Sequence, residues 1–185
     1  MRVFAALPLP PAAKSAIEEA LATARSRFTR VKWVRADGMH LTLHFFGEVP
    51  NEGVAALSHV FEDAALRRPC IPARLGKPGQ FPQKGSPRVL WIGLEKGVEE
   101  MRDYWRLFES KIAPLGWTAD ARGFSPHVTI ARAGSAPVDP GWTECVELPA
   151  LDFAIEECVL FQSILDRAGA RYIPVQKIAF AKGIS

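Results

Sequence analysis

The sequence has few cysteines, and they are widely spaced. Cys70, Cys145 and Cys158 are odd in number and form no C-x-x-C pair. This pattern argues against a disulfide framework and against a zinc knuckle, and it is typical of reduced thiols in the cytoplasm. A chain of 185 residues needs neither kind of cross-link, because it buries about 70% of the surface that its unfolded form exposes.

Long apolar runs are missing as well. The N-terminal apolar run from Val3 to Leu7 ends at Pro8, whereas the apolar part of a secretory signal needs about 7–15 residues. No segment approaches the ~18 apolar residues of a membrane span. We therefore expect a cytoplasmic protein without a membrane partner.

Two sequence signatures of common active sites are also absent. There is no G-x-x-x-x-G-K-[ST] loop to bind the phosphates of ATP, and no G-x-S-x-G to present a nucleophilic serine after a strand. The 14 Gly and 15 Pro are too few for a disordered chain. The net charge of +3 permits an anionic partner without indicating one. What is left is an ordinary globular composition with only four histidines.

Apolar periodicity predicts alternating strands and helices in an α+β domain. The first half shows strands at residues 2–7, 31–34 and 39–46 and helices at 11–28 and 52–66. The proline- and glycine-rich stretch 69–87 is expected to be a loop or linker, with one short strand at most, at 71–75. A similar succession follows, with strands at 88–94, 127–132, 151–155, 158–165 and 171–180 and a helix at 98–112. The order suggests two related halves within one domain that spans residues 1–185.

The two halves share one short motif. His40-Leu-Thr42-Leu in the first half has the same pattern as His127-Val-Thr129-Ile in the second. Side chains alternate across a strand, so each His lies on the same face as its Thr, while the aliphatic residues face the core. Two such strands across a cleft present two imidazoles, one to accept a proton and one to donate it, beside two hydroxyls that hydrogen-bond an anion. The pair therefore predicts a site for phosphoryl transfer without a metal.

Two other interpretations of the motif remain open. A single strand His beside a Thr is most often a structural residue, although the pairing makes that interpretation weaker here. A zinc site would have only His40 and His127 as nitrogen ligands and no paired cysteine, so distant acidic residues would have to complete it.

With these motifs and their flanking residues, the sequence resembles the two-histidine (2H) phosphoesterase superfamily, and within it the bacterial and archaeal RNA 2′,3′-cyclic phosphodiesterases, also called 2′-5′ RNA ligases. The similarity covers the closing hairpin and four segments: Arg2-Val-Phe-Ala-Ala-Leu-Pro, Lys32-Trp-Val, Met39-His-Leu-Thr-Leu-His-Phe-Phe-Gly-Glu-Val and Phe124-Ser-Pro-His-Val-Thr-Ile-Ala-Arg. It implies a bilobal α+β fold with pseudo-two-fold symmetry. Two antiparallel sheets with outer helices would surround a central cleft, with one motif in each lobe.

The resemblance also implies the chemistry. His127 would be the proton acceptor that activates water, and His40 the proton donor to the departing 3′ oxygen, so that hydrolysis of an RNA 2′,3′-cyclic phosphate leaves a 2′-phosphomonoester. Thr42, Thr129 and Arg132 would bind the phosphate. Neither a metal nor another cofactor is implied. The expected partner is RNA with a 2′,3′-cyclic phosphate end, such as a tRNA half, and the expected state is a monomer.

Other activities stay open. Reversible opening of the cyclic phosphodiester with a 5′-hydroxyl as the nucleophile, in place of water, would give ATP-independent 2′-5′ RNA ligation. The alternatives are a phosphodiesterase for small cyclic or 2′-5′-linked nucleotides and a module that binds an RNA end without turnover. Four aromatic residues are candidates for stacking on a terminal base, although strand aromatics more often belong to the core: Phe4, Trp33, Phe45 and Phe81.

Strand alternation sets two further expectations about the neighbours of the motifs. Arg132 comes five residues after His127 and so falls on the opposite face, unless the strand bulges near Ala131. His44, where members of the family often have Lys, shares the face of His40 by simple alternation. A structural role is the more frequent one for such a histidine.

Overall fold

The computed structural model describes residues 1–65, 68–118, 123–134, 138–166 and 169–181. The strands are β1 (Arg2–Pro8), β2 (Val31–Trp33), β3 (His40–Glu48), β4 (Ile71–Phe81), β5 (Val89–Lys96), β6 (His127–Ala133), β7 (Asp152–Ile155), β8 (Glu157–Asp166) and β9 (Gly169–Ala179). The helices are α1 (Pro11–Ala20), α2 (Ala22–Arg27), α3 (Asn51–Ala65) and α4 (Val98–Ile112). Three short 3-10 helices accompany them: η1 (Ala36–Gly38), η2 (Ala113–Leu115) and η3 (Pro140–Cys145).

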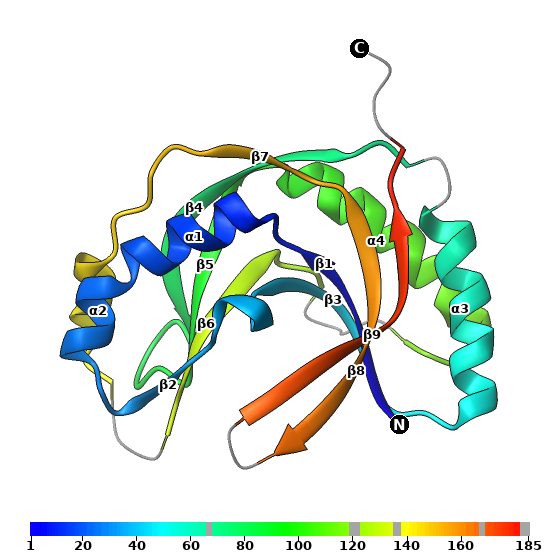
Figure 1. The fold of residues 1–185 in the computed structure, drawn as a ribbon, viewed down its shortest axis with the longest axis horizontal. Helices are drawn as coiled ribbons and strands as arrows, with labels where there is room; N and C mark the ends of the chain where they lie inside the picture. Colours follow the sequence, from blue (N-terminus) through cyan, green and yellow to red (C-terminus); the bar gives the residue numbers. More distant parts are fainter. Residues whose placement is uncertain (66–67, 119–122, 135–137, 167–168, 182–185) are drawn as a thin grey trace.

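The described strands form one curled, nine-stranded antiparallel sheet with the order β7-β4-β5-β6-β3-β1-β8-β9, and β2 lies beside β6 (Figure 1). The order is symmetric about the junction of β3 and β6, because β1 flanks β3 as β5 flanks β6. At this junction the register of the described strands contains one pair, Leu41 opposite Val128. The expected α+β class with antiparallel strands and outer helices is confirmed. The two sheets expected from the resemblance are the two halves of this single sheet, joined where the motif strands diverge.

The described helices pack on one face of the sheet, and the histidines of the motifs lie on the other. Buried residues of all four helices belong to one core cluster with the aliphatic residues of both motifs: Ile17, Ala24, Leu57, Phe108, Leu41, Leu43, Val128 and Ile130. Burial of one such large side chain stabilises the fold by about 1.5–3 kcal/mol. The aliphatic residues therefore anchor each motif strand and leave His and Thr on the free face.

The sequence predicts a loop at 69–87. This prediction is wrong for Ile71–Phe81, which form the long strand β4. This strand pairs with β5 along most of its length and with β7 from Ile71 to Arg74. Beyond Arg74 the pairing described for β4 is with β5 alone, and its register shifts around Leu75 and Pro78. Prolines are tolerated at such edges and bulges because no ladder hydrogen bond is required there.

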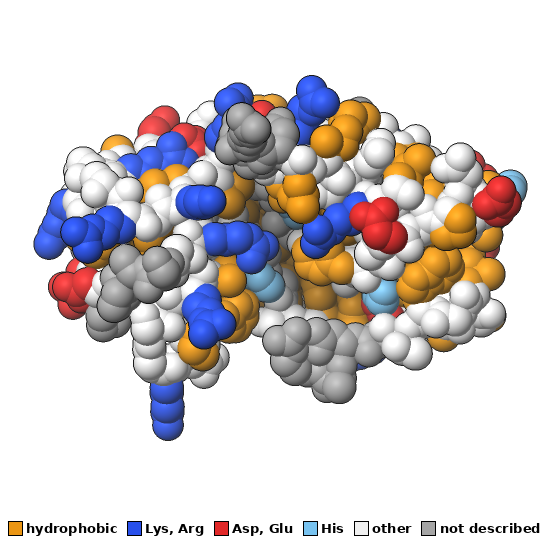
Figure 2. Space-filling view, turned by 90° about the horizontal axis from the view of Figure 1, so that it is seen from below, with side chains coloured by type: hydrophobic (Ala, Val, Ile, Leu, Met, Phe, Trp, Pro, Cys, Tyr) orange, Lys and Arg blue, Asp and Glu red, His pale blue; other side chains and the backbone are white. Residues whose placement is uncertain are grey.

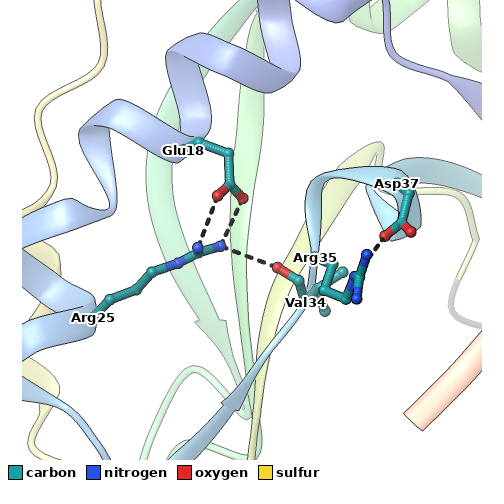
Figure 3. A network of polar contacts seen from close by, with 5 residues as sticks. All are labelled: Glu18, Arg25, Val34, Arg35 and Asp37. Atoms are coloured by element: carbon teal, nitrogen blue, oxygen red, sulfur yellow. Dashed lines mark hydrogen bonds and ion pairs between the residues drawn. The ribbon is translucent and has the colours of Figure 1, made fainter. Parts of the chain in front are cut away.

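The helix expected at 11–28 is divided into α1 and α2. Leu21 lies between them in a helical conformation and is fully buried. Arg25 of α2 holds the divided helix together, since its guanidinium donates to both carboxylate oxygens of Glu18 at 2.7 and 2.6 Å (Figure 3). It also donates to the carbonyl oxygen of Val34 at 3.1 Å. This bidentate contact ties both helices to the segment that leads into β3.

The remaining elements agree with the sequence pattern. Helix α4 spans the predicted residues 98–112, and β8 and β9 form the expected closing hairpin. Residues 167–168 of the hairpin loop lie outside the described residues. No helix in the described part of the chain is long and apolar enough to cross a membrane.

Candidate active site

The two motifs meet where β3 and β6 join. Because Leu41 lies opposite Val128 in antiparallel register, the residues that flank this pair also oppose each other, and each histidine faces the threonine of the other motif. All four side chains are half-buried on the face away from the helices. The structure thus brings together four of the predicted site residues: His40, Thr42, His127 and Thr129.

A backbone hydrogen bond two residues back in the chain orients each histidine. Nδ1 of His127 donates to the carbonyl oxygen of Ser125 at 2.8 Å, and the ring of His40 hydrogen-bonds the backbone of Gly38. A proton on Nδ1 leaves Nε2 of His127 free to accept one when the ring is neutral. Nε2 of His127 is therefore the ring nitrogen that is left to accept a proton.

Burial is the main cause that lowers the pKa of both rings. The pKa of His40 falls to about 4, first because of burial and then through the charges of Lys14, Arg132 and His127. The pKa of His127 is also lowered, by burial first and by the charge of Arg132 second. Hydrogen bonds to the backbone oppose both shifts. The lowered pKa favours the neutral form of both rings at pH 7, and an anion between them would favour their protonated forms.

A bulge in β6 places Arg132 on the same face as His127. The register with β5 shifts by one residue after Thr129. Ile130 and Ala131 are both fully buried in the core, so Arg132 returns to the face of the motif. The sequence predicts that Arg132 reaches this face only if the strand bulges near Ala131, and the bulge is present. The charge of the Arg132 guanidinium acts on both histidines.

An equivalent bulge in β3 makes the face expected for His44 wrong, while its contact with Glu109 agrees with the structural role that the sequence favours. The register with β1 shifts within the motif strand, so that Leu43 and His44 both turn toward the helices. Nδ1 of His44 lies 2.8 Å from Oε1 of Glu109 on α4, with only 9% and 10% of the two side chains exposed. Simple alternation fails because a bulge adds one residue to a face. Phe45 takes the face of His40 instead, at the position that corresponds to Arg132 in β6.

Aromatic rings surround His40. The ring centroids of Phe4 and Tyr172 lie 5.0 and 5.3 Å from that of His40. Phe4 is only 2% exposed, so it supports the imidazole and is not free to stack on a base. Phe45, whose ring centroid lies 5.7 Å from that of Phe4, is 64% exposed. Among the candidate stacking residues beside His40, Phe45 is therefore the one whose ring is exposed.

A second aromatic pair lies next to His127. The ring centroids of Phe81 and Trp91 lie 5.1 and 6.1 Å from that of His127. Trp33, in contrast, donates its Nε1 to the carbonyl oxygen of Phe28 and packs against the core. Sequence reasoning missed Trp91 because nothing in its local pattern separates it from other strand aromatics.

The surroundings of the two histidines are positively charged. Lys14, which sequence reasoning also missed, acts on His40 from helix α1 and lowers its pKa. Figure 2 shows histidine side chains in a hollow of one face, with Lys and Arg around it. Cations beside neutral imidazoles suit an anionic group such as a phosphate. In the described ranges, no group of three or more His, Cys, Asp and Glu is placed to hold a metal ion.

Comparison with known proteins places the chain in a family. The family model described as the 2′-5′ RNA ligase superfamily matches residues 9–167. The chain belongs to this superfamily. The resemblance noted from the motifs is thereby confirmed, and the match includes both motif strands of this superfamily member.

Similar proteins share the fold and 27–31% of the sequence. The chain is 31% identical to the RNA 2′,3′-cyclic phosphodiesterase of Geobacillus stearothermophilus over 89% of its own length, and it spans 52% of that relative. It is 27% identical to the RNA 2′,3′-cyclic phosphodiesterase of Thermotoga maritima, with 100% and 98% of the two chains covered. The crystal structure of TT0787 from Thermus thermophilus superposes with a TM-score of 0.84 at 29% identity, with 97% and 98% covered.

Proposed function

We propose that this superfamily member is a phosphoric diester hydrolase that opens the 2′,3′-cyclic phosphate at the end of an RNA and leaves a 2′-phosphomonoester. One observation carries the proposal: two H-x-T motifs from distant parts of the sequence meet beside the Leu41–Val128 pair, with both imidazoles on one face. The substrate class is drawn from the relatives, which are named RNA 2′,3′-cyclic phosphodiesterase. Both motifs belong to one domain of residues 1–185 in this proposal.

In the proposed reaction the two histidines act on opposite sides of the phosphorus. Neutral His127 accepts a proton from a water molecule, and the water oxygen attacks phosphorus while the bond to the 3′ oxygen breaks. Protonated His40 donates a proton to that departing oxygen. Thr42 and Thr129 donate hydrogen bonds to the non-bridging oxygens, and Arg132 offsets their negative charge.

The low pKa of His40 makes its protonation depend on the substrate. With a pKa of about 4, His40 is mostly neutral at pH 7 when the site holds no anion. A cyclic phosphate carries a negative charge, and this charge favours the imidazolium form of a neighbouring histidine. Binding of the substrate therefore prepares the proton donor for the step in which it acts.

In-line displacement determines on which side of the site the terminal nucleoside lies. The departing 3′ oxygen belongs to the ribose, so the ribose lies on the side of His40, and the attacking water lies on the side of His127. Phe45 is the exposed aromatic residue on the His40 side. The terminal base accordingly stacks on Phe45, a contact that contributes about 1–3 kcal/mol in single-stranded RNA complexes.

Product analysis of one RNA oligonucleotide with a 2′,3′-cyclic phosphate end tests the proposal. EDTA-treated protein is expected to form the 2′-phosphate at an unchanged rate. His40→Ala and His127→Ala should each lower kcat by about 10²–10⁴-fold, whereas His59→Ala, which removes an exposed histidine of α3, should retain activity. Loss of activity on chelation, full activity in His40→Ala, or a 3′-phosphate product contradicts the proposal.

The same assay separates the alternatives. An enzyme for RNA ends should show a higher kcat/KM on the oligonucleotide than on free 2′,3′-cyclic or 2′-5′-linked nucleotides, whereas an enzyme for small nucleotides gains nothing from added nucleotides. A module that only binds RNA ends would show no turnover and would keep its affinity in both His→Ala variants. We expect a cytoplasmic monomer that acts on RNA fragments such as tRNA halves and that, when a 5′-hydroxyl replaces water as the nucleophile, joins RNA ends without ATP.

A further inference from the structure

Two cations lie side by side on the free face of the sheet, next to the site. Lys32 of β2 is directly opposite Arg132 of β6 in antiparallel register. Side chains that oppose each other in such a pair point to the same face of the sheet. Because the bulge in β6 turns Arg132 to the face of His127, Lys32 lies on that face too. A second positive charge therefore borders the site beyond Arg132.

The core holds Lys32 in this orientation. Val31, which precedes it in β2, is buried in the core cluster, and Trp33, which follows it, packs against the same cluster. Nε1 of Trp33 donates to the carbonyl oxygen of Phe28 at 3.1 Å. Side chains alternate along a strand, so Lys32 points away from the core and is exposed.

The two charges have no acidic partner in the described part of the chain. There, neither Lys32 nor Arg132 forms an ion pair or a side-chain hydrogen bond, whereas Lys111 of α4 pairs with Asp63 of α3. Like charges that lie directly opposite each other on neighbouring strands repel. An anionic ligand beside both cations would remove this repulsion, so the pair is suited to RNA phosphates.

We propose that Lys32 binds the phosphate that links the terminal nucleotide to the rest of the RNA, and that it thereby makes the enzyme selective for RNA chains over 2′,3′-cyclic mononucleotides. The inference rests on the proposed function, in which Arg132 offsets the charge of the cyclic phosphate and the terminal ribose lies on the side of His40. A cyclic mononucleotide has no second phosphate. Only a chain therefore gains the contact with Lys32.

The order of the strands places Lys32 on the ribose side of the site. Arg132 pairs with Val89 of β5 at one edge of β6 and with Lys32 at the other. The second edge is also the one that pairs with β3, the strand of His40. The next phosphate of the RNA is bonded to the terminal ribose through the 5′ oxygen. It therefore lies on the side of Lys32 while the cyclic phosphate stays beside Arg132.

Phe45 and Lys32 lie in opposite directions from the site. β3 continues from its motif to Phe45, whereas β6, which is antiparallel to β3, continues from its motif to Arg132. In a ribonucleotide the base is attached at C1′, next to C2′, and the 5′ branch at C4′, next to C3′. The base and the 5′ branch thus flank the cyclic phosphate. A terminal base on Phe45 and a second phosphate at Lys32 agree with this order.

The test compares two dinucleotides that end in a 2′,3′-cyclic phosphate and differ only in the linking group. One has the natural phosphodiester, and the other has a methylphosphonate, which is uncharged. Lys32→Gln should lower kcat/KM on the natural dinucleotide at least fivefold. Most of the loss should be a higher KM, because the contact is equal in the ground state and the transition state. On the neutral dinucleotide and on a 2′,3′-cyclic mononucleotide, kcat/KM should change less than twofold.

Two variants control for charge. Lys32→Arg keeps the cation and should keep the preference for the natural dinucleotide. Lys111→Gln removes one positive charge from α4, which packs on the opposite face of the sheet, and should leave kcat/KM unchanged on all three substrates.

Two further measurements characterise Lys32→Gln. On the natural dinucleotide, the slope of log kcat/KM against log salt concentration should become shallower by about 0.7, as expected for one phosphate contact in a single strand. The melting temperature should not fall, because the substitution removes a like-charge pair.

Each outcome supports or overturns the inference. A loss confined to the natural dinucleotide in Lys32→Gln, and absent from both control variants, supports it. An equal loss on the natural and the neutral dinucleotide overturns it, because Lys32 would then act on the cyclic phosphate. Equal kcat/KM of the parent protein on the two dinucleotides overturns it as well. If the parent protein opens neither dinucleotide, the proposed function itself is wrong.

Discussion

The lowered pKa values of the two histidines predict an acidic optimum for kcat/KM. The proposed mechanism requires the free enzyme to present His40 protonated and His127 neutral. The pKa of His40 is about 4 and that of His127 is below its usual 6.5, so the protonated fraction of His40 declines as the pH rises above both values. On a cyclic-phosphate RNA, kcat/KM should therefore fall about tenfold per pH unit between pH 7 and 8.

The profile of kcat should differ from that of kcat/KM. Bound phosphate raises the pKa of both imidazoles, so the optimum of kcat lies at a higher pH. His59→Ala should leave both profiles in place. A kcat/KM that is constant from pH 6 to pH 8 would contradict the assignment of His40 as the proton donor.

The sequence indicates some residues of the site and does not indicate others. The four motif residues share a repeated pattern, and alternation along a strand puts each His and its Thr on one face. Lys14 and Tyr172, which also act at His40, come from α1 and β9. Tertiary packing brings them to the site, and no local pattern records it.

At the scale of elements, bulges in the two motif strands explain why simple alternation fails after both motifs. Each bulge lies at the end of the motif, where Ile130 in β6 and Leu43 in β3 have no register partner, so that two consecutive residues face the core. The first brings Arg132 to the site, and the second turns His44 away from it. Bulges depend on how neighbouring strands pair, so the sequence of one strand does not determine them. Because strand pairing depends on neighbouring strands, the prolines of β4 also led the sequence to predict a loop there.

The contact between His44 and Glu109 predicts a loss of stability when one partner is removed. Glu109→Ala leaves Nδ1 of His44 buried without its 2.8 Å partner, which costs about 1–3 kcal/mol. In a protein of this size the melting temperature should fall by roughly 2–12 °C. Thermal unfolding followed by circular dichroism measures the change.

A double variant provides the control for this contact. His44→Leu combined with Glu109→Leu should recover most of the stability, because replacement of both buried partners by apolar groups leaves no unsatisfied polar atom. The stability changes of the single variants should therefore not add. Strict additivity would show that the two side chains do not stabilise each other.

In the whole molecule, one residue pair joins the two halves of the sheet, and both halves contribute to one core. Apart from β4 and the division between α1 and α2, the order of strands and helices is visible in the periodicity of the sequence, and so is the relation between the two halves. The periodicity does not show that β3 and β6 join the halves through one pair, Leu41 and Val128. Such a join depends on the twist and divergence of two strands that are distant in the sequence. The core on the opposite face compensates for it, because helices and strands of both halves contribute to one cluster.

This shared core predicts a single cooperative unfolding transition. Leu41 is fully buried at the join, and Leu41→Ala should cost about 2–5 kcal/mol, which lowers the melting temperature by roughly 4–20 °C. Far-UV circular dichroism and tryptophan fluorescence should report the same midpoint, because both halves lose their support together. Leu115→Ala, at a residue that is 40% exposed, is the control and should change stability by less than about 0.5 kcal/mol. Two separate transitions, or a shift seen by one probe alone, would show that the halves unfold independently and do not form one domain.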